Sequence, residues 1–326
     1  SAEMAAAQTE SHAVVAMISI LFIVLAVIFG LLVYRRNAPL GISSVIGVIA
    51  IIICLVIGLN FHPVELSYNT WMIICGIYIA IASVTPVWIL LQPRDYLSSF
   101  LLYGMMIIAV LGVLGCAIFG DTHANMDIPA FTTGYNATYG PIFPALFVTI
   151  ACGAISGFHS LVSSGTTAKQ LDNEKHAKPI AYGGMLIECA LALVSLCAVG
   201  YIWNQYAGGE ITVPTTVFAT GISQMVGCIP GLGNDTAITT VSSLLVLAVS
   251  AFCLTSLDTA TRLARYMFQE FWLEPGQSVE DTTGYKKVLT NKYLATIITV
   301  ILGVGLVLTG YAKIWGLFGA ANQLLA

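Results

Sequence analysis

Apolar runs of about twenty residues, separated by short polar segments, dominate the chain. A helix that rises 1.5 Å per residue needs roughly that length to cross about 30 Å of hydrocarbon. We therefore expect an all-α polytopic membrane protein with about nine transmembrane helices. The runs predict crossings near residues 12–34, 41–60, 70–92, 98–119, 141–168, 180–203, 239–266 and 290–311, with a ninth that begins near Ile314.

The composition supports this interpretation, because 58% of the 326 residues are hydrophobic and only 9% are charged. A soluble domain has roughly a quarter of its residues charged, so that class is excluded. No basic patch beyond the polar loops indicates a nucleic-acid partner. The eight cysteines lie almost all in apolar runs without a C-x-x-C pair, which favours buried structural thiols over a disulfide or a metal cluster. The pair Gly183 and Gly184 predicts a close approach between helices.

The basic residues indicate the orientation. When the crossings alternate, every Lys and Arg except Lys313 falls on one side, which the positive-inside rule identifies as cytoplasmic. Two longer segments, 120–140 and 204–238, then lie outside. In the second, apolar pieces between Pro214 and Pro230 are too short to cross. We expect a helical hairpin there, on or within the outer face, that acts as a lid.

A polar stretch, GAISGFHSLVSSGTTAKQ at Gly153 to Gln170, ends the predicted crossing at 141–168. Its glycines and hydroxyl residues favour an interrupted helix, whose freed backbone groups must find a solute or an ion inside a bilayer. His159 fits either a substrate or proton role or that of a satisfied packing residue. The residues predicted to bind substrate are Gly157, Phe158, His159, Ser160, Ser163, Ser164, Gly165 and Thr166.

Two carboxylates, Glu188 and Asp258, lie within predicted crossings, and each is about 12 Å along its helix from the cytoplasmic end. A charge at membrane depth is costly and marks a site. For Asp258, an ion pair with Arg262 one turn later competes with binding of a cation or proton, for which Thr255 and Ser256 would add oxygen ligands. Glu188 has no basic residue three or four positions away. It fits a proton carrier or a neutral acid bonded to a neighbouring helix.

Five segments carry a resemblance to a known family. They are PVWILLQPRDYLSSF (Pro86 to Phe100), SGFHSLVSSGTTAKQL (Ser156 to Leu171), YGGMLIE (Tyr182 to Glu188), LTSLDTATRLARYMFQE (Leu254 to Glu270) and LFGAANQLLA (Leu317 to Ala326). In this order, and over most of the chain, they closely resemble the carbon starvation protein A family of bacterial inner-membrane transporters.

The resemblance implies a fold similar to the amino-acid, polyamine and organocation superfamily, with two inverted five-helix repeats that each begin with a broken helix. On that template 141–168 is the discontinuous first helix of the second repeat, 239–266 is its third helix, and 204–238 is the outer lid. The hydroxyls that hold sodium in the superfamily would correspond to Thr255 and Ser256.

The resemblance also implies uptake of peptides during carbon starvation, and for some members uptake of pyruvate with protons. We expect a secondary-active transporter of the bacterial inner membrane that works by alternating access with H⁺ or Na⁺ symport, without a cofactor. The alternative is a membrane nutrient sensor or receptor that binds solute without transporting it. No H-E-x-x-H or G-x-S-x-G motif indicates an enzyme.

The ends of the chain favour a piece of a longer protein. The first residues lack the basic region of a signal peptide, and the last residues, GLFGAANQLLA, stop within an apolar run. Nothing in residues 1–60 matches the glycine-rich broken helix with which members of the resembled family begin. We therefore expect residues 1–326 to be a single transmembrane transporter domain and an internal fragment, which lacks the opening helices, the C-terminal part and half of the binding site.

Overall fold

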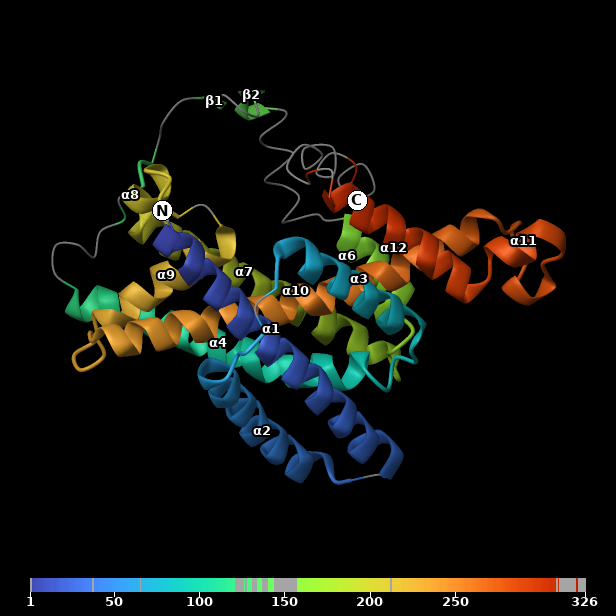
Figure 1. Ribbon diagram of the computed structural model, residues 1–326, viewed down its shortest axis with the longest axis horizontal. Helices are drawn as coiled ribbons and strands as arrows, with labels where there is room; N and C mark the ends of the chain where they lie inside the picture. The colour runs from blue at the N-terminus through green and yellow to red at the C-terminus, as the bar shows by residue number, and fades with distance from the viewer. Residues whose placement is uncertain are drawn as a thin grey trace. The chain divides into compact units, whose positions relative to one another are not determined.

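The computed structural model describes residues 2–36, 38–64, 66–120, 126, 128–130, 134–136, 140–143, 157–211, 213–308, 310 and 321. Within these ranges the regular structure is helical apart from one short hairpin, which confirms the all-α prediction for them (Figure 1). The α-helices are α1 (Ala2–Gly30), α2 (Leu40–Asn60), α3 (Tyr68–Val84), α4 (Leu91–Phe119), α6 (Gly157–Val162), α7 (Ala177–Tyr201), α8 (Trp203–Ala207), α9 (Pro214–Gly227), α10 (Asp235–Phe271), α11 (Gly284–Leu289) and α12 (Lys292–Leu308). The antiparallel hairpin pairs β1 (Tyr135–Asn136) with β2 (Gly140–Pro141).

Five helices of the described chain are long and apolar enough to cross a membrane. They are Ala13–Arg35, Leu40–Asn60, Leu91–Phe119, Glu174–Tyr201 and Asp235–Phe271, while Asn69–Val84 and Lys292–Leu308 are shorter apolar helices. Most predicted crossings therefore correspond to helices with shifted ends. The ninth predicted crossing near Ile314 and the part of 141–168 between 144 and 156 lie outside the described residues.

The predicted end of the third crossing and the predicted start of the fourth are wrong. Helix α3 ends at Val84, because Pro86 disfavours the helical conformation at the residue before it. Helix α4 already begins at Leu91. Arg94, expected in a cytoplasmic loop, therefore lies in the first turns of a helix and is fully buried.

Large apolar side chains cover the outside of several helices. On α2 each of a series of branched residues is more than half exposed: Ile42, Val45, Ile46, Ile49, Ile52 and Ile53. Water penalises such a surface, whereas lipid tails are as apolar as these side chains. The exposure therefore supports a surface that faces lipid.

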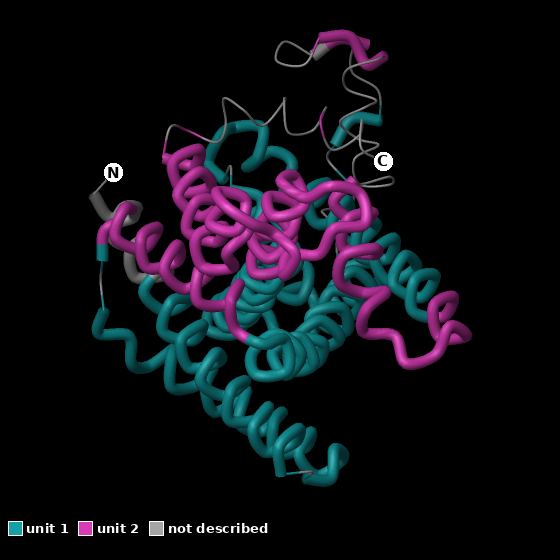
Figure 2. The backbone as a smooth tube through the Cα atoms, turned by 90° about the vertical axis from the view of Figure 1, so that its right-hand side faces the viewer, with its two compact units in different colours: residues 1–66, 86–130, 180–255 teal, residues 67–85, 131–179, 256–326 magenta. Residues whose placement is uncertain are grey.

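The contacts of the chain group into two compact units (Figure 2). Unit 1 comprises Ser1–Leu66, Pro86–Ala130 and Ile180–Thr255, and unit 2 comprises Ser67–Thr85, Phe131–Pro179 and Ser256–Ala326. Each unit assembles segments that are distant in the sequence, and α10 contributes its first part to unit 1 and its last part to unit 2. The expectation of one transporter domain over residues 1–326 stays a prediction.

The main core of unit 1 forms where α4, α7, α9 and α10 meet. Helix α9 lies within this core, with buried side chains that include Val217, Phe218, Ile222, Met225 and Val226. The predicted segment 204–238 is therefore helical at α9, and its action as a lid stays a prediction. The close helix approach expected at Gly183 and Gly184 is not found, since no described atom lies within 4 Å of a Cβ built there.

In unit 2, α3 packs along α12. Gly76 of α3 permits this approach, because a Cβ there would lie 3.1 Å from Cγ2 of Val304. The last turns of α10 are tied to the segment before α12 by the amide of Gln269, which donates a 2.6 Å hydrogen bond to the carbonyl oxygen of Thr290. These contacts position the polar side chains at the end of α10.

Candidate functional site

Asp258 and Tyr78 form the centre of a candidate site in unit 2. Asp258 lies in α10 and is 2% exposed, and Tyr78 lies in α3, 180 positions earlier. The Tyr78 hydroxyl donates a 2.8 Å hydrogen bond to Oδ2 of Asp258. A hydrogen bond to an ionised acceptor is about twice as strong as one between neutral groups. The phenol therefore stabilises an acidic group among the helices of unit 2.

Arg262, one turn after Asp258, binds the end of α3. Its Nη2 donates to the carbonyl oxygens of Ala82 and Thr85, at 2.8 Å each, and Nζ of Lys292 donates to a third carbonyl of the same helix end at 3.1 Å. A helix C-terminus leaves carbonyls without intrahelical partners and carries partial negative charge, so it favours cations. The sequence suggested an ion pair between Asp258 and Arg262. In the structure both side chains form hydrogen bonds to α3 or to the residue that follows it.

The stretch predicted to bind substrate combines two kinds of helix. Helix α6 (Gly157–Val162) continues as a π-helix at Ser163–Thr167. A π-turn interrupts the regular hydrogen-bond ladder and occurs frequently at functional sites. The described part of the stretch is therefore helical throughout with a π-turn in its second half, and the discontinuous helix expected from its glycines and hydroxyls stays a prediction.

This stretch packs against the end of α10 within unit 2. A Cβ built on Gly165 would lie 2.5 Å from Cδ2 of Leu263, and the Lys169 ammonium lies 5.2 Å from the centre of the Tyr266 ring. These two contacts place Gly165 and Lys169 beside the last turns of α10.

The predicted substrate residues differ in exposure. His159, Ser160, Ser163 and Ser164 are exposed, Phe158, Gly165 and Thr166 are half-buried, and Gly157 is buried. Oγ1 of Thr166 has no hydrogen-bond partner among the described residues. The segment thus presents an imidazole and several hydroxyls along one helix of unit 2.

The remaining predicted coupling residues are more dispersed. Thr255 and Ser256 lie in α10 on the two sides of the unit boundary, and Glu188 lies exposed on α7 in unit 1. Oγ1 of Thr255 is buried without a hydrogen-bond partner in the described part of the chain. One such hydroxyl fits one ligand position of the sodium ion that the family resemblance implies. The residues that the structure describes contain no group of three or more His, Cys, Asp or Glu that could hold a metal ion.

Two residues of interest escaped sequence reasoning. Tyr78 does not stand out among the 14 tyrosines of the chain. The one feature of the sequence that could have indicated it is a polar phenol hydroxyl within an apolar run. Arg94 lies in the segment QPRDY, and Nη2 of its guanidinium is 3.4 Å from Oδ1 of Asp95. The proline that precedes this charged pair could have indicated that a helix begins here, because proline is favoured in the first turn of a helix.

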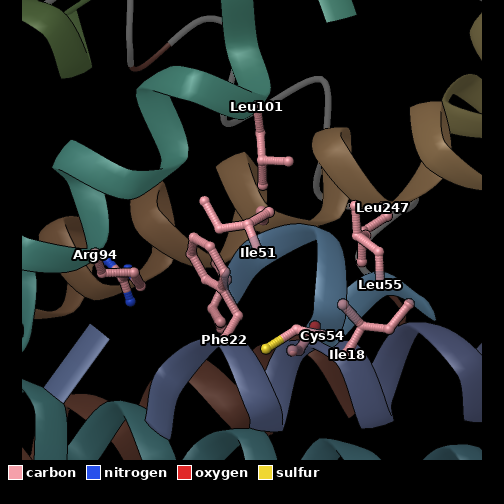
Figure 3. Close-up of a pocket in the computed structure, with 11 residues that line it drawn as sticks. Ile18, Phe22, Ile51, Cys54, Leu55, Arg94, Leu101 and Leu247 are labelled. Carbon is pink, nitrogen blue, oxygen red and sulfur yellow. The ribbon is translucent and has the colours of Figure 1, made fainter. Parts of the chain in front are cut away.

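A small cavity in unit 1 lies beside Arg94. Figure 3 shows this side chain at the edge of the cavity, together with Phe22, Ile51 and Leu101. The cavity volume is about 10 Å³, which is about the space that a single water molecule needs. This cavity is therefore too small to hold a nutrient.

The chain is similar to known transporters. The model of the family described as carbon starvation protein CstA matches residues 2–208 and 207–326. The peptide transporter CstA of Bacillus subtilis is 28% identical over 339 residues, which cover 90% of this chain and 54% of that protein. The peptide transporter CstA of Escherichia coli is 34% identical over 324 residues, which cover 82% of this chain and 44% of that protein.

A relative with a different named substrate also matches. The pyruvate/proton symporter BtsT of Escherichia coli is 35% identical over 185 residues, which cover 52% of this chain and 24% of that protein. The chain spans about half the length of the peptide transporters that it matches. No solved structure matches the chain.

Proposed function

Since the chain belongs to the carbon starvation protein CstA family, we propose that it is part of a secondary-active transporter for peptides or pyruvate, driven by proton or sodium symport. The family predicted from the sequence motifs is confirmed by this match. Its relatives are transporters and not enzymes, and its long apolar helices are consistent with a membrane. The bacterial inner membrane and the inverted-repeat core are part of the proposal.

The observation that carries the proposal is the buried hydrogen bond from Tyr78 to Asp258. A carboxylate among apolar membrane helices is costly when charged and marks an ion or proton pathway. Binding of a proton or a sodium ion neutralises Asp258. The neutralised carboxyl group then accepts a weaker hydrogen bond from the Tyr78 hydroxyl. Because Tyr78 belongs to the helix whose end Arg262 holds, loading of the carboxylate changes the contact between α3 and α10.

The segment Gly157–Thr167 is the proposed substrate side. Peptides and pyruvate both present a carboxylate, to which the ring N–H of an imidazole and hydroxyl groups, such as those of His159 and Ser160, donate hydrogen bonds. Gly165 of this segment contacts Leu263, five residues after Asp258 on α10 of the same unit. The proposed substrate and coupling-ion sites therefore belong to neighbouring segments of unit 2, as the adjacent sites of known symporters do.

Uptake measurements test this function. The purified protein in vesicles is offered labelled pyruvate or a labelled dipeptide under a proton gradient, a sodium gradient, or neither. We expect one substrate to accumulate under one of the gradients. Accumulation that persists after both gradients are collapsed would rule out symport.

Variants of the central pair test the assignment of the coupling group. Asp258→Asn should abolish gradient-driven uptake, and Tyr78→Phe should reduce its rate about tenfold, the effect of losing about 1.5 kcal/mol from a hydrogen bond to a charged group. The matched control is Glu280→Gln, which removes an exposed carboxylate of the same unit. If Asp258→Asn transports as well as this control, Asp258 is not the coupling group.

The alternative is a membrane sensor or receptor that binds a nutrient without moving it. Binding of pyruvate or the dipeptide to the purified protein, combined with no accumulation under either gradient, would favour this function over transport.

A further inference from the structure

Two thiols from different helices meet in unit 1. Sγ of Cys116, in the last turn of α4, lies 3.7 Å from Sγ of Cys228, which directly follows α9. Helices α4 and α9 form the most extensive helix contact of the unit. The approach is close at this end, because a Cβ on Gly115 would overlap the side chain of Ile229.

We propose that Cys116 and Cys228 form a reversible disulfide that ties α9 to α4. A disulfide needs the sulfurs about 2.05 Å apart, so they must approach by less than about 2 Å, which is within the reach of χ1 rotation in two cysteines. Both side chains lie on elements that already pack together, and no helix has to be displaced over a long distance.

The surroundings favour Cys228 as the thiol that reacts first. Cys116 is buried, whereas Cys228 is half-buried and lies two residues before the exposed Pro230. The Tyr201 hydroxyl lies 3.6 Å from Sγ of Cys228, within reach of a weak hydrogen bond to the sulfur. The greater exposure of Cys228 lets an oxidant reach it before Cys116.

The oxidant is a small-molecule disulfide, and the exchange takes two steps. The Cys228 thiolate attacks one sulfur of the oxidant, forms a mixed disulfide and releases one small thiol. The Cys116 thiolate then attacks Sγ of Cys228 and releases the second small thiol. The two protein thiols lose two electrons and two protons in total, and the oxidant is reduced to two thiols.

The disulfide has a consequence for transport that rests on the proposed function. The segment 204–238, which contains α9, is the predicted outer lid, and the predicted orientation places both cysteines toward the outer face, where bacterial envelopes are oxidising. A lid tied to α4 cannot move independently of it. Oxidation therefore slows uptake, and reduction restores it.

The test uses the full chain in vesicles, treated with 4,4′-dithiodipyridine and then with an alkylating reagent. We expect oxidation to protect Cys116 and Cys228 from alkylation, to yield a linked peptide with Cys116 and Cys228 on mass analysis, and to be reversed by dithiothreitol. Cys116→Ser and Cys228→Ser should each abolish the link, whereas Cys189→Ser, an exposed thiol on α7, should retain it. Continued alkylation of both thiols, or a mixed disulfide on Cys228 alone, would overturn the proposal.

Uptake by the same vesicles separates the two proposals. A complete cross-link with unchanged uptake would refute the effect on the lid. A complete cross-link in protein that accumulates no substrate in either redox state would refute the proposed transport function and would support the disulfide itself.

Discussion

Replacement of Gly221 by Ala should destabilise unit 1 by about 2 kcal/mol. A Cβ at this position of α9 would lie 2.5 Å from the carbonyl oxygen of Ala198 in α7, and 2.9 Å from its Cα and carbonyl carbon. All three are backbone atoms, which cannot turn aside as the end of a side chain does. The two helices must therefore separate by about 1 Å to restore van der Waals contact.

The magnitude follows from two opposing effects. Overpacking of a core costs about 1–3 kcal/mol, and a backbone overlap belongs to the upper part of that range. Alanine returns up to about 1 kcal/mol, because it is a better helix former than glycine. Gly184→Ala in α7 is the matched control, since no described atom lies within 4 Å of its Cβ. The control should gain up to about 1 kcal/mol, so the two variants should differ by about 3 kcal/mol.

Denaturation of the detergent-solubilised variants, followed by tryptophan fluorescence and by the fraction that stays monodisperse on heating, measures this difference. Wild type should lie between the two variants. Equal stability of Gly221→Ala and Gly184→Ala would show that α7 and α9 do not approach as closely as the structure has them.

Other predictions concern unit 2. Arg262→Met should loosen the last turn of α3 by about 2 kcal/mol, because two hydrogen bonds from a charged donor are lost; faster amide hydrogen exchange there checks this, and Arg262→Lys should show a smaller change. Ser278→Ala should raise the pKa of Asp281, because hydrogen bonds from the side chain and backbone of Ser278 hold that pKa below its ordinary value of 3.8. The depressed pKa stabilises the turn above about pH 4, and this contribution is lost as the pH falls through the folded-state value. Hydrogen exchange at acid pH should therefore show that the turn opens. Unchanged protection of its amides would contradict this prediction.

Two long apolar helices were the most predictable. The crossing expected at 41–60 is α2 (Leu40–Asn60), and that at 180–203 is α7 (Ala177–Tyr201). Both follow from the thickness of the hydrocarbon, which any apolar run of sufficient length must match. The sequence analysis misplaced the boundary between α3 and α4, because apolar residues continue past Pro86. The backbone nevertheless leaves the helical conformation just before this proline.

The candidate site was only partly predictable. Asp258 could be singled out because a carboxylate in an apolar run is rare by itself. Its partner Tyr78 could not, because many tyrosines serve as packing or interface residues. The sequence predicted that Arg262 could form an ion pair with Asp258, one turn away. Its hydrogen bonds instead go to carbonyl oxygens at the end of α3, 177 and 180 positions earlier in the chain.

The sequence by itself determined that the helices of this protein are suited to a lipid bilayer, where the helices approximately lie, and to which family the protein belongs. Hydropathy, element length and motifs are local properties of the chain. Only the tertiary structure decided which polar groups meet: Tyr78 with Asp258, and Cys116 with Cys228. It also decided that Gly221 lies at a close helix contact, whereas no atom of the described residues lies within 4 Å of a Cβ on Gly183 or Gly184. The physical reason is that apolar helices attract one another with little directional preference in lipid. Their pairing is settled by small residues and hydrogen bonds that come together only when distant segments pack.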